Sequence, residues 1–535
     1  MILAIPIFLL LLTAVLILGI RIIRPTFPAL WLIASAGSII AWLSMLVLRL
    51  QLPSSLMLLH WSSAAIYNAS PTLVLDYSSW GYGFALVTLV LVIVLVSPGH
   101  MRSRAEVINL SGSLAFGGLA LVAVLAANPL TLFLGWAAMD IVELLIFTHS
   151  AEQPDRLRHT LRVYSSRVAG LILAFWTFVV GSRESGFNTS FDNISPQVGI
   201  FLLIAIGLRL GVFPLHLPFT SETNVRRGQR TLLRMAPAAS ALVVLSRLPS
   251  STVGSRLEVW LSILAAIALM YASIRWLLQK DELLARPYWT ISFSASAIIC
   301  VLTGNPFLSL SWGISLIFLS GALFIFDSYN RFMRILVGLA ILSLAGLPYS
   351  ANSSGMQALA AEGHFYWLIP AFFAMLFLLY GFIDKVSVKP GVAANQEQII
   401  YLTYPLAMLV LVSAFIVTGL FGWRGSRVEG IWWFSIPLVL VGLGLLVWNW
   451  RTRRVEAFLF GLSEMVDAPE GAAGLMGIIQ RVINLQWVYN LVQTLLRGLG
   501  AVVSRVELIL EGQGGFLWAA LVFVLFLAII QLSGG

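Results

Sequence analysis

Charged residues are scarce in this chain of 535 residues. Asp, Glu, Lys and Arg together make up 10% of it, whereas hydrophobic residues make up 59% and the mean hydropathy is +0.94. A soluble domain carries about 25% charged residues, so this composition excludes an ordinary soluble protein. We therefore expect an integral membrane protein whose chain crosses the bilayer many times.

Cysteine is almost absent, since Cys300 is the only one. A single cysteine excludes an intramolecular disulfide, a cysteine-rich metal site and an iron–sulfur cluster held by this chain alone. The sequence offers no other redox-cofactor site. We therefore expect neither a cofactor nor a metal in this chain, and no redox chemistry of its own.

Long apolar runs fill most of the sequence. A membrane-spanning helix needs about 20 apolar residues, and these runs are continuous rather than alternating at period two, which favours helices over a barrel. We expect residues 1–22 to be a retained first span. The predicted fold is all-α and polytopic, with sixteen spans near residues 2–22, 27–48, 79–97, 106–126, 129–149, 160–181, 197–218, 232–249, 257–279, 287–303, 307–326, 332–351, 364–383, 398–420, 431–449 and 516–532.

The net charge of +9 follows the expected topology of the chain. Twenty Lys and Arg residues, Arg234 and Arg286 among them, are assigned to loops after odd-numbered spans, against six after even-numbered spans. Because positive loops stay in the cytoplasm, this distribution places both termini outside. We expect a multi-pass protein of the cell inner (cytoplasmic) membrane, with no nucleic-acid partner.

The pattern divides the chain into three parts. Residues 1–450 form a transmembrane domain of fifteen spans, residues 451–514 an amphipathic segment, and residues 515–535 a C-terminal transmembrane anchor. Between residues 475 and 510, apolar residues recur at three- and four-residue steps, which predicts a helix of roughly 50 Å on the cytoplasmic membrane surface. This helix is either an ordinary interfacial helix or a lateral helix that docks on neighbouring subunits.

Three ionisable residues, Asp140, Glu143 and Arg209, lie near the middle of apolar runs. A charge at the bilayer centre costs about 2.5–3.5 kcal/mol on insertion scales, so such residues are usually kept for a task or for each other. In one interpretation the acid loads a proton at a half-channel and Arg209 tunes its affinity. In the other, a buried ion pair fixes the packing of the helices.

Two of the expected spans are interrupted by glycine and proline. The seventh ends in GVFPLHLP (residues 211–218) and the twelfth in LAGLPYS (residues 344–350). Proline removes a backbone donor, so each helix should unwind there, and paired broken helices are typical of transporters built from inverted repeats. His216 in the first break is either a proton-transfer group or a partner for the freed carbonyls.

Residues 128–136 (NPLTLFLGW) and 208–218 (LRLGVFPLHLP) resemble the fifth and seventh helices of a known family. These are the antiporter-like, proton-pumping membrane subunits of respiratory complex I (NADH–quinone oxidoreductase), membrane-bound hydrogenases and multisubunit sodium/proton antiporters. The span count and the lateral helix are similar to the long distal member of that set. Shorter similarities occur at residues 74–78, 166–168, 280–282 and 346–348.

The chain departs from this family at its charged positions. Ala137 stands where the family has a glutamate, and Asp140, about one helical turn on, would take over that role. Arg209 stands where the family has a lysine, and an arginine cannot hand on a proton. Four other basic positions of the family fall on residues without a charge: Ala239, Phe293, Gly321 and Met356. The three lysines of the chain lie at or near expected cytoplasmic ends: Lys280, Lys385 and Lys389. Together these observations exclude a complete lysine relay.

The resemblance implies a membrane subunit of a redox-driven, proton-translocating complex. Asp140, Glu143, Arg209 and His216 would then form a buried polar axis that conducts protons, and the partners would be other membrane subunits and the lipid bilayer. Two alternatives remain open. The chain is either a structural subunit of such a complex that has lost transport, or a component of a sodium/proton antiporter.

Overall fold

The computed structural model describes most of the chain up to residue 452. The described residues are 2–25, 27, 29–58, 70–97, 104–150, 164, 166–179, 191, 194–219, 227–250, 256–325, 331–360, 365–388, 398–421, 431–452, 494, 497 and 498. The chain divides into two compact units, Met1–Phe460 and Gly461–Gly535. Nearly all described residues belong to the first unit.

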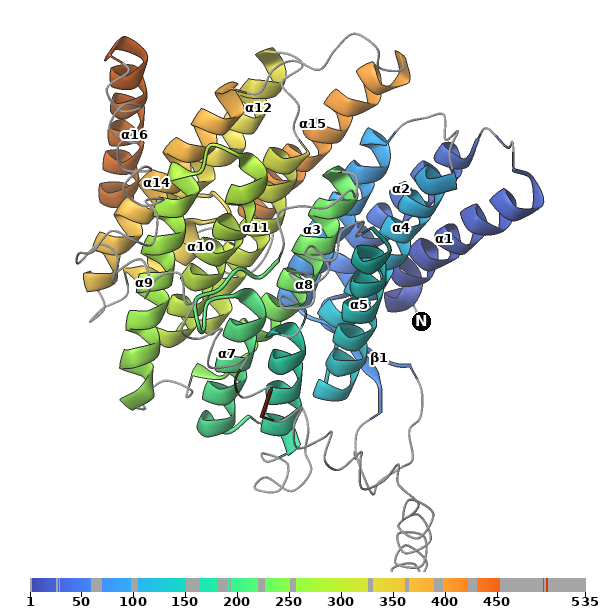
Figure 1. Cartoon of the computed structure of the whole chain (residues 1–535), viewed down its shortest axis with the longest axis horizontal. Coiled ribbons are helices and arrows are strands. Elements are labelled where there is room, and N and C mark those ends of the chain that lie inside the picture. Colours follow the sequence, from blue (N-terminus) through green and yellow to red (C-terminus); the bar gives the residue numbers. More distant parts are fainter. Residues whose placement is uncertain are drawn as a thin grey trace, which may run out of the picture. The chain divides into compact units, whose positions relative to one another are not determined.

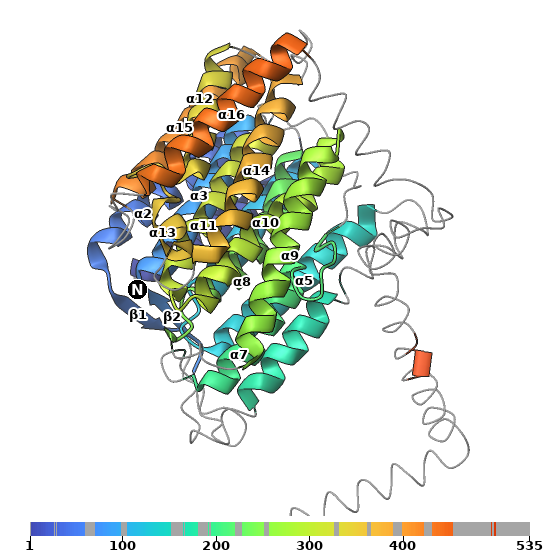
Figure 2. The same ribbon diagram turned by 90° about the vertical axis from the view of Figure 1, so that its left-hand side faces the viewer.

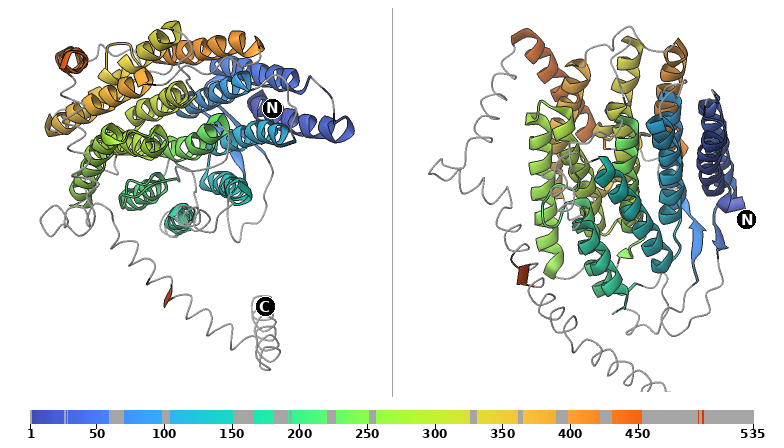
Figure 3. Two further views of the ribbon diagram at one scale, coloured as in Figure 1. Left: turned by 45° about the horizontal axis from the view of Figure 1, so that its top comes forward. Right: turned by 45° about the vertical axis from the view of Figure 1, so that its right-hand side comes forward.

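Helices lying side by side build the first unit (Figures 1, 2 and 3). Nine helices of the described ranges are long and apolar enough to cross a membrane. The expected all-α, polytopic membrane fold is therefore confirmed. The helices are α1 (Ile5–Ile23), α2 (Leu30–Leu48), α3 (Tyr77–Val96), α4 (Arg104–Val124), α5 (Pro129–Ser150), Ser166–Val179, α7 (Pro196–Leu210), α8 (Arg227–Leu245), α9 (Arg256–Leu278), α10 (Glu282–Leu302), α11 (Ser309–Phe324), α12 (Arg331–Ile341), α13 (Ser353–Leu359), α14 (Leu368–Val388), α15 (Gln398–Phe421) and α16 (Trp432–Thr452), with 3-10 turns at Ile2–Ala4, Arg49–Gln51, Pro306–Leu308, Leu342–Ala345 and Phe365–Trp367.

Helices α3 and α11 lie in the middle of this bundle. Both are apolar on every side, and 94% and 89% of their spanning residues are buried. A helix that is hydrophobic all round has no face for water or headgroups, so neighbouring helices cover it. Accordingly α3 packs against α2, α4, α8, α11 and α15. Peripheral helices instead expose large apolar side chains, such as Phe8 on α1 and Trp260 on α9, as a lipid-facing surface requires.

Both expected helix breaks are present, and each occurs at a glycine. Helix α7 ends at Leu210, and Gly211 follows with a φ of 78°. Helix α12 and its 3-10 turn end at Ala345, and Gly346 follows with a φ of 67°. A side chain at Gly211 would also bring its Cβ within 2.4 Å of the His216 carbonyl oxygen, so only glycine fits there.

A short hairpin precedes α3, with β1 (Ser54–Met57) antiparallel to β2 (Thr72–Leu75). Asp76 then caps α3 by accepting from the Ser79 amide, and its carboxylate lies 3.1 Å from Arg247 Nε. Burial alone would raise the pKa of Asp76, but Arg247 and the Ser79 donors outweigh it and hold that pKa below its usual range. Asp76 is therefore an ionised helix cap that ties α3 to the end of α8.

The amphipathic segment expected at 451–514 and the anchor expected at 515–535 lie almost entirely outside the described residues. The same holds for the sixteenth expected span, 516–532. Thr452, at the end of α16, is the last residue of the continuous described chain.

Candidate functional site

Helix α5 carries the two candidate acids on one face. Asn128 caps this helix, because its side-chain oxygen accepts from the Thr131 amide at 2.9 Å, and Pro129 begins the first turn. Glu143 follows Asp140 by three positions, so their side chains project about one turn apart on similar sides. Both are buried, with 1% and 4% of their surface exposed.

Arg209 of α7 holds Asp140 through two hydrogen bonds. Its Nη1 donates to one carboxylate oxygen at 2.9 Å and its Nη2 to the other at 3.0 Å. Nη1 also donates to the Arg167 carbonyl at 3.0 Å, and the guanidinium lies 4.3 Å from the centre of the Trp136 ring. This two-pronged, charge-assisted contact is among the strongest that a carboxylate makes in a protein.

A glycine allows the helices to approach closely at this point. Gly170, in the helix Ser166–Val179, lies against α7, and a Cβ there would come within 2.6 Å of Arg209 Cγ and 3.0 Å of the Ala205 carbonyl oxygen. A larger residue would therefore push α7 away. The approach through Gly170 is what brings the Arg167 carbonyl within reach of Arg209.

Glu143 does not share Arg209 but pairs with Arg167. Arg167 Nη1 donates to the Glu143 carboxylate, and its Nη2 lies 3.4 Å from the Pro218 carbonyl oxygen beyond the break in α7. The sequence analysis did not identify Arg167 as the partner of Glu143. The available signal was an arginine at the start of an apolar run, together with a buried glutamate that needs a counter-charge.

His216 belongs to the break rather than to either ion pair. Its Nδ1 lies 2.7 Å from the Pro214 carbonyl oxygen, and its amide donates to the Gly211 carbonyl at 3.0 Å. Within the described residues it is hydrogen-bonded to neither Asp140 nor Glu143. This geometry favours the role of satisfying carbonyls that the interrupted helix leaves free.

A second group of buried charges lies on α8 and α10. Arg234 and Arg286 expose 1% and 0% of their surface, and their guanidinium groups lie over the rings of Phe219 and Phe324 at 4.5 and 4.4 Å. Arg286 Nη2 also donates to Glu282 Oε1 at 2.7 Å. The sequence analysis counted both arginines as loop charges, and that assignment is wrong, because each lies within a helix and is covered by its neighbours.

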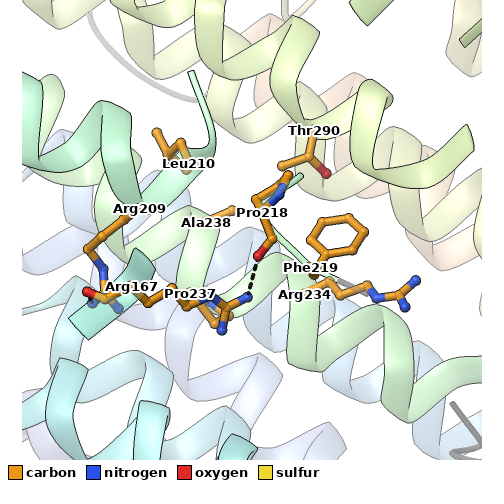
Figure 4. Close-up of a pocket in the computed structure, with 9 residues that line it drawn as sticks. All are labelled: Arg167, Arg209, Leu210, Pro218, Phe219, Arg234, Pro237, Ala238 and Thr290. Carbon is orange, nitrogen blue, oxygen red and sulfur yellow. Dashed lines mark hydrogen bonds between the residues drawn. The ribbon is translucent and has the colours of Figure 1, made fainter. Parts of the chain in front are cut away.

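A small cavity of about 10 Å³ connects the two groups (Figure 4). That volume matches about one water molecule. In Figure 4, Arg167 lies between Arg209 and Arg234, so the three guanidinium groups are spread along the pocket rather than converging on one point. The residues that line the cavity are Arg167, Arg209, Leu210, Pro218, Phe219, Arg234, Pro237, Ala238 and Thr290.

The positions where the antiporter-like family would have further basic residues are buried among apolar groups. The Phe293 ring contacts those of Trp289 and Trp312 at 4.8 and 6.1 Å between centroids. A Cβ on Gly321 would meet only the methyl groups of two leucines. These four positions therefore offer no proton-exchanging group: Ala239, Phe293, Gly321 and Met356. In the described ranges, no three His, Cys, Asp or Glu side chains gather to hold a metal.

No family model and no curated protein matches the sequence. Solved structures do match. A chain of the Mrp complex from Dietzia sp. DQ12-45-1b gives a TM-score of 0.68 at 15% identity, covering 100% of this chain, which spans only 63% of that one. A chain of the membrane-bound sulfane sulfur reductase, an archaeal respiratory membrane complex, gives a TM-score of 0.65 at 16% identity; the match covers 99% of this chain and 100% of that one. A chain of respiratory complex I from Thermus thermophilus gives a TM-score of 0.61 at 18% identity; the match covers 83% of this chain and 99% of that one. The expected resemblance in fold is confirmed, and this chain has the membrane-subunit fold that it shares with chains of these three complexes.

Proposed function

We propose that this chain is a membrane subunit of a redox-driven, proton-translocating complex in the cell inner membrane. The fold supports this proposal, because respiratory membrane complexes contain chains with the same fold. The observation that carries it is Asp140, a buried carboxylate in the middle of α5 that Arg209 holds through two hydrogen bonds. The partners would be other membrane subunits, which would supply the redox chemistry.

In this proposal Asp140 is the group that loads the proton. The Arg209 guanidinium occupies both carboxylate oxygens, and a change elsewhere in the complex that draws it away would free them to accept a proton. Arg209 cannot release a proton itself and acts as the electrostatic clamp. Glu143, which Arg167 holds through one hydrogen-bonded ion pair, would be the next carboxylate along the path.

A structural subunit that has lost transport remains the second candidate. The apolar packing around Phe293 favours this second candidate, because no lysine stands at the positions where the family would continue a relay from Arg209. A buried ion pair between α5 and α7 would then serve only to fix the packing of these helices.

The substitution Asp140→Asn separates the two candidates. An amide has nearly the same shape but cannot take up a proton as a carboxylate does, so the translocation carried by this subunit should be lost while the complex still assembles. The measurement is the number of protons moved per electron in reconstituted vesicles.

Asp281→Asn makes the same chemical change at an exposed position. Asp281 caps α10 by accepting from the Leu283 amide, and asparagine caps equally well, so this control should leave the ratio unchanged. An unchanged ratio in Asp140→Asn as well would support the structural subunit instead.

We further propose that both termini face outward and that the chain beyond α16 enters the cytoplasm. The distribution of Lys and Arg supports this orientation. A Thr452→Cys variant should therefore react with a membrane-impermeant thiol reagent from the cytoplasmic side only. Cys300, the one native thiol, is buried and provides the unreactive background. Labelling from the outside alone would reverse the proposed orientation.

A further inference from the structure

Lys385 differs from every other buried cation of the described residues. The described residues include five buried cations. Lys385 of α14, which is 6% exposed, is one of them. The other four are arginines: Arg167, Arg209, Arg234 and Arg286. An arginine stays protonated in a protein, whereas a buried lysine can give up its proton. Among these five groups, therefore, only Lys385 can both release a proton and take one up.

The Lys385 ammonium is held against α9 by weak partners. Its Nζ donates to the Trp276 carbonyl at 2.8 Å and lies 4.4 Å from the centre of the Trp276 ring. Gly381, one turn earlier, makes this possible, because a Cβ there would come within 2.8 Å of the Trp276 indole nitrogen. A neutral amine can still donate to the Trp276 carbonyl, although it loses the cation–π attraction to the ring, and its formation would leave no carboxylate buried and unpaired.

Two acidic residues stand on the same helix as Lys385 and on a helix packed against it. They are Asp384, its neighbour on α14, and Glu282 of α10, whose carboxylate is bound by Arg286. From α9, only the carbonyl and ring of Trp276 contact it among the described residues. Among the described residues, Lys385 therefore has acidic groups on its own helix and on a neighbouring one but no ion pair with either.

Polar groups near the cavity extend along α10, the helix that packs against α14. Thr290 lies one turn after Arg286 on α10, donates to the Arg286 carbonyl at 3.4 Å, and lines the cavity that Arg167 and Arg209 also line. Arg286 Nη2 in turn donates to Glu282 Oε1 at 2.7 Å. Polar groups of α10 thus lie between the cavity beside Arg209 and the end of α10 at which Glu282 stands.

We propose that Lys385 is a proton-exchanging group of this chain and provides, on α14, the titratable lysine that the broken twelfth span lacks. In the exchange step an Nζ–H bond breaks, the proton passes to a water molecule on the side of Glu282, and the amine keeps the electron pair. The reverse step restores the ammonium. This inference rests on the proposed function, since it assigns a second exchange site to the same path.

The competing role is structural. Trp276 lies in the last turn of α9, where helix carbonyls have no partner within the helix, and a cationic side chain commonly satisfies them. Arginine would do this as well as lysine, but arginine cannot exchange a proton. Lys385→Arg therefore separates the two roles, and Lys385→Met removes both.

The test compares Lys385→Arg, Lys385→Met and Asp140→Asn in reconstituted complexes, with exposed Lys280→Arg as the matched control. We expect Lys385→Arg to assemble normally and to lose as many protons per electron as Asp140→Asn, whereas Lys280→Arg should retain the full ratio. A full ratio in Lys385→Arg, beside a loss in Asp140→Asn, would overturn the role of Lys385 and leave the proposed function intact.

A second measurement does not depend on pumping or on a folded variant. The chain has only three lysines, so ¹⁵N labelling of lysine side chains in the full chain in lipid nanodiscs gives at most three signals, and Lys280→Arg and Lys385→Arg assign two of them. A group that exchanges protons has to visit the neutral state. We expect a neutral-amine signal from Lys385 at the pH at which vesicles pump; an ammonium signal alone throughout that range would overturn the proposal.

Discussion

Replacing Arg209 with methionine should lower the free energy of unfolding by about 3–5 kcal/mol, the usual cost of breaking a buried ion pair from one side. Methionine fills a similar volume but leaves the Asp140 carboxylate, 1% exposed, without the two hydrogen bonds that now hold it. The measurement is the unfolding of the full chain in detergent, followed by helix content.

The double variant Asp140→Leu/Arg209→Met is the control for this prediction. It removes both charges together, and replacing a buried pair by apolar residues is often neutral. The double variant should therefore be more stable than Arg209→Met alone. If the double variant and Arg209→Met have the same free energy of unfolding, the unpaired Asp140 charge does not account for the loss of stability. Arg209→Lys should be tolerated better than methionine, because lysine keeps a positive charge near Asp140.

Arg167→Met should also lower the free energy of unfolding by about 3–5 kcal/mol, because it leaves Glu143 buried without its cation. The effect should also reach the break in α7, since Arg167 lies between Glu143 and the Pro218 carbonyl. Unfolding of the full chain again provides the measurement, and protection of the 211–218 amides from hydrogen exchange reports on the break.

Arg167→Lys makes this second prediction specific. Lysine restores the positive charge beside Glu143. Its single ammonium lacks the forked shape of the guanidinium and cannot contact Glu143 and the Pro218 carbonyl at the same time. Stability should therefore recover in large part while the 211–218 amides remain less protected. Equal losses of stability in Arg167→Lys and Arg167→Met would mean that the shape of the arginine, rather than its charge, supports the fold.

The arrangement of charges bears directly on the choice between pump and scaffold. The family's basic positions on the later helices are apolar here, and the described buried charges are instead those around the cavity, the Arg286–Glu282 pair on α10 and Lys385 on α14. Three arginines, Arg167, Arg209 and Arg234, line the cavity, and fixed positive charges oppose the passage of cations, protons included. Among the described residues discussed above, proton transfer would then depend on Asp140, Glu143 and Lys385.

The sequence alone determined the fold class and the position of the helix breaks. Hydrophobic length and continuity are local properties, so a membrane helix can be predicted from its own residues, and glycine with proline marks where it stops. The same reasoning identified Asp140, Glu143 and Arg209, because a charge inside an apolar run is conspicuous without knowledge of its neighbours.

Only the tertiary structure decided which charges meet and which are buried. Asp140 and Arg209 are 69 residues apart, Glu143 pairs with Arg167 instead, and His216 bonds within its own loop. The sequence pattern assigns Arg234 and Arg286 to loops and Lys385 to the end of a span. Whether such a residue reaches water depends on which neighbouring helices cover it, and that packing is a contact between distant parts of the chain that no local pattern encodes.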